Sequence, residues 1–73
     1  MTQFAARIKE IRKLKKLTQK QMAELLGTTE RNYQYYEAGE REPNLESFFD
    51  MVEILDVSAD YLLGRTYKVD AHK

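Results

Sequence analysis

With 73 residues, the chain is long enough for one domain, near the size at which a single apolar core holds a fold without cross-links. It has no Cys and a single His, His72, which excludes a disulfide framework, a thiolate metal site and a His-rich site, and we expect no cofactor. The N-terminus lacks a secretory apolar core, and no apolar stretch approaches the length of a membrane span. We therefore expect a soluble, cytoplasmic protein with no membrane partner.

The formal net charge is zero, but the charges are unevenly distributed along the chain. Residues 1–20 contain seven basic side chains and one acid, whereas residues 21–64 contain two basic side chains and ten acids. A nucleic-acid-binding domain usually carries a net positive charge, so the zero total argues against that class. The asymmetry nevertheless predicts one basic face for an anionic partner and an acidic remainder that limits non-specific association.

Apolar residues recur at helical spacing in the segments that three glycines and one proline separate. The first such segment predicts a helix over about residues 2–15 with basic residues on its other faces. The residues expected to face the core are Phe4, Ile8, Ile11 and Leu14 or Lys15 in the first helix, Met22, Leu25 and Leu26 in the second, and Leu45, Phe48, Met51 or Val52, and Leu55 in the fourth.

The segment around Gly27 has the spacing of two helices joined by a tight turn. Thr18 and Gln21 match a capping box, which predicts that a second helix begins at Thr18. Gly27 suits the left-handed position that ends a helix, and Thr29 suits the N-cap of the next one. Because only Thr28 separates them, the two helices must cross at a steep angle, as in a helix-turn-helix.

The third helix is expected from Glu30 to Ala38, with Gly39 closing it. Two further helices follow, capped by Asn44 and Ser58. In the third helix, the residues expected to face the body are Tyr33, Tyr36 and Glu37. The expected domain covers residues 1–65, and residues 66–73 are expected to form a flexible tail.

Three stretches resemble the phage-repressor and Cro helix-turn-helix family: LTQKQMAELLGTT at residues 17–29, YEAG at 36–39 followed by Pro43, and VSADYLLG at 57–64. The resemblance covers about residues 4–65. It implies an all-α, compact five-helix domain of the lambda-repressor type, with the second helix across the DNA backbone and the third in the major groove. The sequence departs from the family pattern at Tyr33, where an aliphatic residue is usual, at Glu30, and in the acidic loop with Glu40 and Glu42.

Four side chains on the outer side of the third helix are the predicted base readers: Glu30, Arg31, Gln34 and Tyr35. Arg suits guanine O6 and N7, and Gln suits adenine N6 and N7. Two roles are open for the Glu30 carboxylate: it accepts a hydrogen bond from cytosine N4, or it repels phosphates and so acts against binding. Two are also open for Tyr35, a contact with a thymine methyl group or a hydrogen bond to a phosphate. The alternative to base reading is that these four residues form the ordinary polar face of a surface helix.

Gln19 is the first residue of the second helix, where free backbone N–H groups and the helix dipole favour a phosphate. The matching Gln of the family binds phosphate, and the alternative is a solvated first-turn residue. The other predicted phosphate contacts are Thr29, Asn32, Arg41, Arg7 and Lys15. For Asn32, a structural role in the first turn of its helix remains an equal alternative.

Two further groups are expected to have architectural roles. The resemblance implies an ion pair between Arg12 and Glu37, which links the first helix to the end of the third. Tyr61, Leu62 and Leu63 exceed what so short a last helix needs for its own burial. Part of this set is expected in the core, and the remainder is the predicted dimer interface.

These observations predict a sequence-specific transcriptional regulator, a repressor that binds double-stranded DNA at a palindromic operator as a homodimer, with no small-molecule ligand. The alternative is a protein-interaction module of the antitoxin or adaptor kind on the same fold, which the zero net charge and Glu30 favour. We do not expect an enzyme, because the sequence offers no nucleophile and base, no metal-ligand constellation and no Gly-rich phosphate loop.

Overall fold

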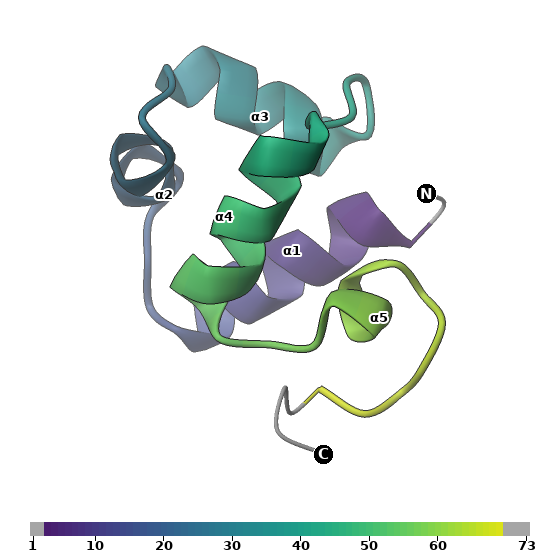
Figure 1. Cartoon of the computed structure of the whole chain (residues 1–73). Helices are drawn as coiled ribbons and strands as arrows, with labels where there is room; N and C mark the ends of the chain where they lie inside the picture. The colour runs from purple at the N-terminus through teal and green to yellow at the C-terminus, as the bar shows by residue number, and fades with distance from the viewer. Residues whose placement is uncertain (1–2, 70–73) are drawn as a thin grey trace.

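Five helices form the part of the chain, residues 3–69, that the computed structural model describes (Figure 1). They are α1 (Phe4–Leu14), α2 (Gln19–Leu26), α3 (Glu30–Ala38), α4 (Leu45–Leu55) and α5 (Ala59–Leu62). The all-α, five-helix prediction is confirmed. Within residues 3–69, each helix is too short or too polar to cross a membrane.

Local side-chain caps determine where four of these helices begin. Thr18 forms the predicted capping box with Gln21 at the start of α2. The side chains of Thr29, Asn44 and Ser58 likewise accept a backbone N–H three residues further on, at the starts of α3, α4 and α5. Because each cap satisfies a backbone donor that has no partner within its helix, each contributes about 1 kcal/mol to stability.

All five helices contribute to the core, and α4 crosses in front of α1 in Figure 1. Its largest fully buried side chains come from all five helices and the α4–α5 turn: Ile8, Met22, Tyr33, Met51, Leu55, Val57 and Leu62. Burial of each large apolar side chain stabilises the fold by roughly 1.5–3 kcal/mol.

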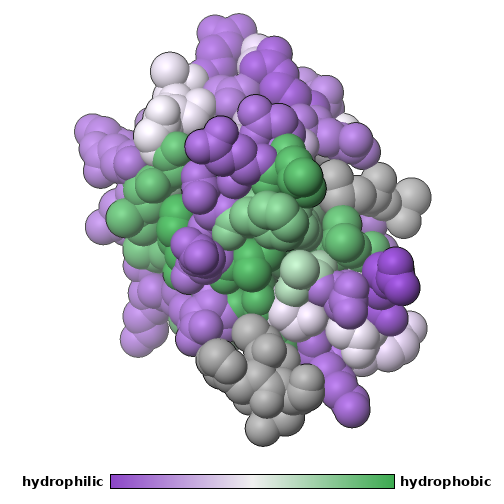
Figure 2. Space-filling view, viewed as in Figure 1, coloured by the Kyte–Doolittle hydropathy of each residue, from purple (hydrophilic) through white to green (hydrophobic). Residues whose placement is uncertain are grey.

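Three leucines predicted to face the core are instead exposed: Leu14, Leu25 and Leu45 are 70%, 57% and 69% accessible. Lys15, the alternative to Leu14, is exposed as well. The spacing gives the period of an apolar stripe but not how much of its width a neighbouring helix covers. Figure 2 shows hydrophobic side chains gathered over α4, where Leu45 and the 53% exposed Phe49 belong.

The segment after α5 returns to the body of the domain. The backbone N–H of Ser58 donates to the carbonyl oxygen of Val69 at 2.8 Å, and Arg7 donates to that of Thr66 at 2.8 Å. Residues 66–69, predicted to begin a flexible tail, are therefore held by hydrogen bonds. The rest of that predicted tail, including His72, lies outside the described residues.

Candidate nucleic-acid interface

The turn between α2 and α3 places one side of α3 outside the core. Gly27 has a φ of 73°, the left-handed conformation predicted for it, and Thr28 N–H donates to the carbonyl oxygen of Ala23 at 3.0 Å. On the inner side of α3, Tyr33 and Tyr36 are buried and their rings meet edge to face, with centroids 6.3 Å apart. The opposite side of α3 is therefore free to contact another molecule.

The four predicted base-reading residues lie together on this outer side. Glu30, Arg31 and Gln34 are exposed and Tyr35 is half-exposed. A single surface hollow is lined by all four. They come from two successive turns of α3, so the structure gathers donors, acceptors and an aromatic ring in one place.

Two arginines flank Tyr35. Arg31 Nε donates to the Tyr35 hydroxyl at 3.0 Å, and the Arg41 guanidinium lies 4.8 Å from the centroid of the same ring. These arginines are the two basic residues of the otherwise acidic segment 21–64. Although they are ten positions apart in sequence, the fold places both arginines beside the Tyr35 ring.

Asn32 joins the start of α3 to this cluster. Its Nδ2 donates to Thr28 Oγ1 at 2.9 Å and to the Tyr36 hydroxyl at 3.0 Å, while its Oδ1 accepts from Arg41. Its backbone N–H donates to Thr29 Oγ1 at 3.0 Å. The side chain of Asn32 thus secures the first turn of α3 and holds Arg41, and Thr29 keeps a hydroxyl proton available on an exposed residue.

A buried ion pair joins α1 to the end of α3. Arg12 Nε lies 2.5 Å from Glu37 Oε2, with their side chains only 8% and 4% exposed, and Arg12 Nη2 donates to Glu37 Oε1 at 3.2 Å. Arg12 Nη1 also donates to the carbonyl oxygen of Leu17 at 2.7 Å. The guanidinium therefore ties together α1, the α1–α2 turn and α3, which is the architectural role that the resemblance implies.

Tyr33 and Gln19 complete this network. The Tyr33 hydroxyl donates to Glu37 Oε2 at 2.6 Å, and Gln19 Nε2 donates to Glu37 Oε1 at 3.0 Å. Burial by itself raises the pKa of Glu37, but the hydrogen bonds from Arg12, Tyr33 and Gln19 outweigh it and hold that pKa below its usual value. Burial, and then the bond to Glu37, raise the pKa of Tyr33.

These two links to Glu37 were not predicted from the sequence. The departure from the family pattern at Tyr33 was visible, and Tyr33 precedes Glu37 by four residues, a spacing that places two side chains on one face of a helix. The participation of Gln19 carried no comparable signal, because it comes from a different helix.

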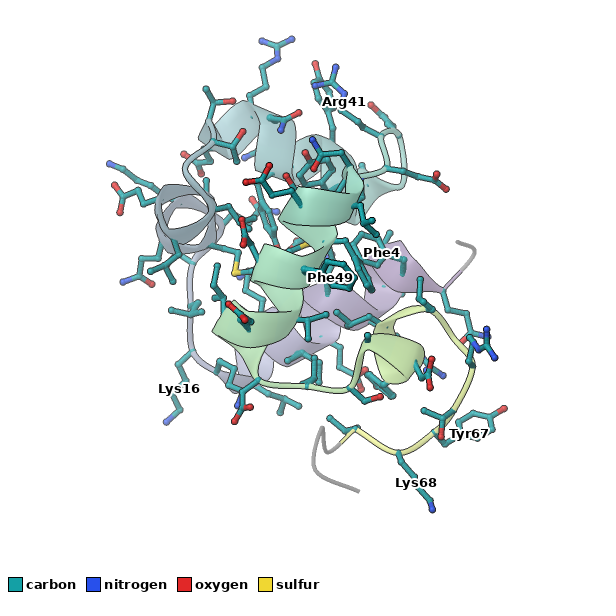
Figure 3. All side chains as sticks on the ribbon, viewed as in Figure 1. Phe4, Lys16, Arg41, Phe49, Tyr67 and Lys68 are labelled. Atoms are coloured by element: carbon teal, nitrogen blue, oxygen red, sulfur yellow. The ribbon has the colours of Figure 1, made fainter. Side chains whose placement is uncertain are left out.

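Two predicted phosphate contacts lie outside this surface. Arg7 is half-buried, and its Nη1 donates to the carbonyl oxygens of Tyr61 and Thr66 at 2.6 and 2.8 Å, so its guanidinium binds the C-terminal segment. Lys15 is exposed at the C-cap of α1. Figure 3 shows its neighbour Lys16 at the opposite end of the molecule from Arg41.

Two of the three predicted dimer residues belong to the core. Leu62 is fully buried, and Tyr61 is buried with its hydroxyl donating to Glu10 Oε1 at 2.7 Å. Leu63 is half-buried against the core. The short α5 packs on both α1 and α4, which covers more of its apolar surface than its length suggests.

A short helix, a glycine turn and a second helix with an exposed polar face define a helix-turn-helix domain. The sequence profile of the helix-turn-helix family matches residues 8–62, and the chain belongs to this family, of the Cro and C1 type. The relatives that match the chain are named as transcriptional regulators, in agreement with the predicted non-enzymatic class.

Several bacterial regulators are similar to the chain. The uncharacterized HTH-type transcriptional regulator YqaE of Bacillus subtilis is 50% identical over 60 residues, which are 82% of this chain and 52% of that protein. AnsR, an HTH-type transcriptional regulator of the same organism, is 39% identical over 81% of this chain and 51% of its own length. The cryptic phage CTXphi transcriptional repressor RstR of Vibrio cholerae is 37% identical over 81% of this chain and 53% of its own length. The chain spans about half the length of these relatives.

Proposed function

We propose that this protein is a sequence-specific DNA-binding transcriptional regulator that inserts the outer side of α3 into the major groove. The observation that carries the proposal is a surface hollow on α3 that Glu30, Arg31, Gln34 and Tyr35 line together. Major-groove recognition needs a helix with exposed donors and acceptors near its start, and this side of α3 has that chemistry.

The proposed phosphate contacts lie on α2, α3 and the segments that flank α3. The contacts are Gln19 at the start of α2, Thr29 at the start of α3, Asn32, and Arg41 after α3. Arg41 is exposed and carries the charge, whereas Gln19 and Thr29 are at helix N-termini, where backbone N–H groups favour an anion. Arg7 is not among these contacts, because its Nη1 donates to two backbone carbonyl oxygens. Lys15 is not among them either, because it is at the C-cap of α1.

We further propose a cytoplasmic repressor that binds a palindromic operator as a homodimer. The repressor role is supported by the likeness to RstR, which is described as a phage repressor. Two copies on successive major grooves place their recognition helices about 34 Å apart. Among the exposed apolar side chains, we assign Leu45 and Phe49 on α4 to the contact with a second copy. Leu63 is half-buried, and Tyr61 and Leu62 are in the core.

The proposal is tested by selecting duplexes from a random-site library and titrating the preferred site and a scrambled site by fluorescence anisotropy at two salt concentrations. We expect the preferred site to bind at least 10³-fold more tightly than the scrambled site. The Arg31→Ala and Gln34→Ala variants are expected to relax the preference at separate base pairs. Equal binding of both sites at low salt would contradict the proposal.

A protein-interaction role is the second candidate, and the acidic Glu30 at the start of α3 together with the zero net charge favour it. The same two variants separate the candidates. If the chain acts only on another protein, Arg31→Ala and Gln34→Ala leave its weak DNA binding unchanged across sequences.

A further inference from the structure

A chain of side-chain hydrogen bonds runs from the buried ion pair to the outer side of α3. Glu37 Oε1 accepts from Gln19 Nε2 at 3.0 Å, and Gln19 Oε1 accepts from Gln34 Nε2 at 3.2 Å. Glu37 is almost fully buried, Gln19 is half-buried and Gln34 is exposed. These hydrogen bonds therefore connect the buried Glu37 with Gln34, which lines the hollow on α3.

The charge on Glu37 determines which atoms donate and which accept in this series of hydrogen bonds. Arg12 and Tyr33 both donate to its carboxylate, which keeps it charged, and a charged carboxylate can only accept hydrogen bonds. Gln19 must then turn its Nε2 inward to Glu37. Its Oε1 is left facing outward, where it can only accept.

The orientation of Gln19 determines that of Gln34. Because the outward atom of Gln19 is an acceptor, Gln34 must turn its NH₂ group toward it. A rotated Gln34 amide would place two carbonyl oxygens against each other. Gln34 therefore uses one N–H internally and keeps its Oε1 and its second N–H for a bound molecule.

This donor and acceptor pair matches one base edge in the major groove. Adenine offers N7 as acceptor and N6 as donor, whereas guanine offers two acceptors, N7 and O6. We propose that Glu37 and Gln19 are positioning residues that hold the Gln34 amide in the orientation that selects adenine over guanine. The inference rests on the proposed function, since it assigns the base that one of the proposed contacts reads.

The experiment measures base preference, which a purely structural role would not change. Gln34→Ala, compared with wild type on every single-base variant of the selected site, identifies the base pair that Gln34 reads. Gln19→Met keeps the length of the side chain and removes both of its hydrogen bonds. Lys20→Met is the matched control, because Lys20 is the exposed neighbour of Gln19 on α2.

At the base pair identified with Gln34→Ala, we expect wild type to prefer adenine over guanine about tenfold or more. Gln19→Met should reduce this ratio to about two or less, in addition to weakening all sites, whereas Lys20→Met should weaken all sites and leave the ratio unchanged. In Gln19→Met, the ¹⁵N–¹H signals of the Gln34 side-chain amide should also move from their wild-type positions. The backbone signals of the core should stay where they are in wild type.

Two results would overturn the inference alone: a wild-type preference at that pair for guanine, or an adenine preference that Gln19→Met retains in full. The same holds if the protein selects a site but Gln34→Ala changes no base preference. Failure of wild type to select any site instead contradicts the proposed function, and the inference with it.

Discussion

The guanidinium carbon of Arg7 lies 4.2 Å from the centroid of the Tyr61 ring, while Arg7 Nη1 donates to the carbonyl oxygen of Tyr61 at 2.6 Å. The same nitrogen donates to the carbonyl oxygen of Thr66. One side chain of α1 thus satisfies two backbone acceptors, at the end of α5 and in the segment that follows. A cation predicted to face DNA is instead part of the scaffold.

We therefore expect Arg7→Gln to destabilise the fold by about 2 kcal/mol, because hydrogen bonds from a charged donor are lost in a half-buried position. Urea unfolding followed by circular dichroism measures this change. In the folded protein, the salt dependence of DNA affinity should stay at its wild-type slope. Arg41→Gln is the matched comparison, and it should lower that slope by about 1 with little effect on stability. A lowered slope in Arg7→Gln would place Arg7 back among the phosphate contacts.

Removing one partner of the buried Arg12–Glu37 pair should be far more costly than removing both. Arg12→Met alone leaves the Glu37 carboxylate buried without its main partner, and we expect a loss of about 3 kcal/mol. Glu37→Leu alone leaves the guanidinium unpaired, with a similar loss. The double variant should recover part of the stability, which a double-mutant cycle of urea midpoints measures. Additive losses would show that the two side chains do not interact.

Stability should also fall in acid because of Glu37. The pKa of this carboxyl is lower in the folded protein than its ordinary value of 4.5, so below that value the unfolded chain binds more protons than the folded one. The contribution of Glu37 is complete above about pH 5 and disappears as the pH falls through the lowered folded pKa. Thermal midpoints of wild type and Glu37→Gln, measured from pH 7 to pH 2.5, should converge as the pH falls. A constant difference between them would contradict this assignment.

The exposed end of α4 offers a test of dimer formation. Leu45 is 69% exposed on α4 and Leu14 is 70% exposed at the end of α1, so the two leucines are a matched pair. If α4 meets a second copy, Leu45→Ser should weaken dimer formation in sedimentation velocity by about tenfold, because the buried apolar area of a leucine is lost from the interface. Leu14→Ser should leave the association unchanged. Equal effects of both variants would argue against an interface at α4.

Much of the fold could be predicted because its determinants are local. The capping box of Thr18 and Gln21, the left-handed Gly27 and the N-cap at Thr29 act over three or four residues, and each is found where the sequence predicts it. Since these short-range interactions specify the turn, they also specify which side of α3 lies outside. The proximity of the four predicted base-reading residues follows from that turn and the helical period.

The partners of individual side chains could not be predicted in this way. Arg7 and Thr66 are 59 positions apart in sequence, and Gln19 and Glu37 are 18 apart. Whether a leucine at helical spacing is covered, as Leu55 is, or exposed, as Leu45 is, depends on which helix packs over it. The amino-acid order by itself therefore determined the helices, their caps and the outer side of α3, because these arise from interactions between near neighbours. Only the packing of distant segments decided which arginine supports the scaffold and how the glutamines are oriented, because burial and hydrogen bonding across helices depend on positions in space.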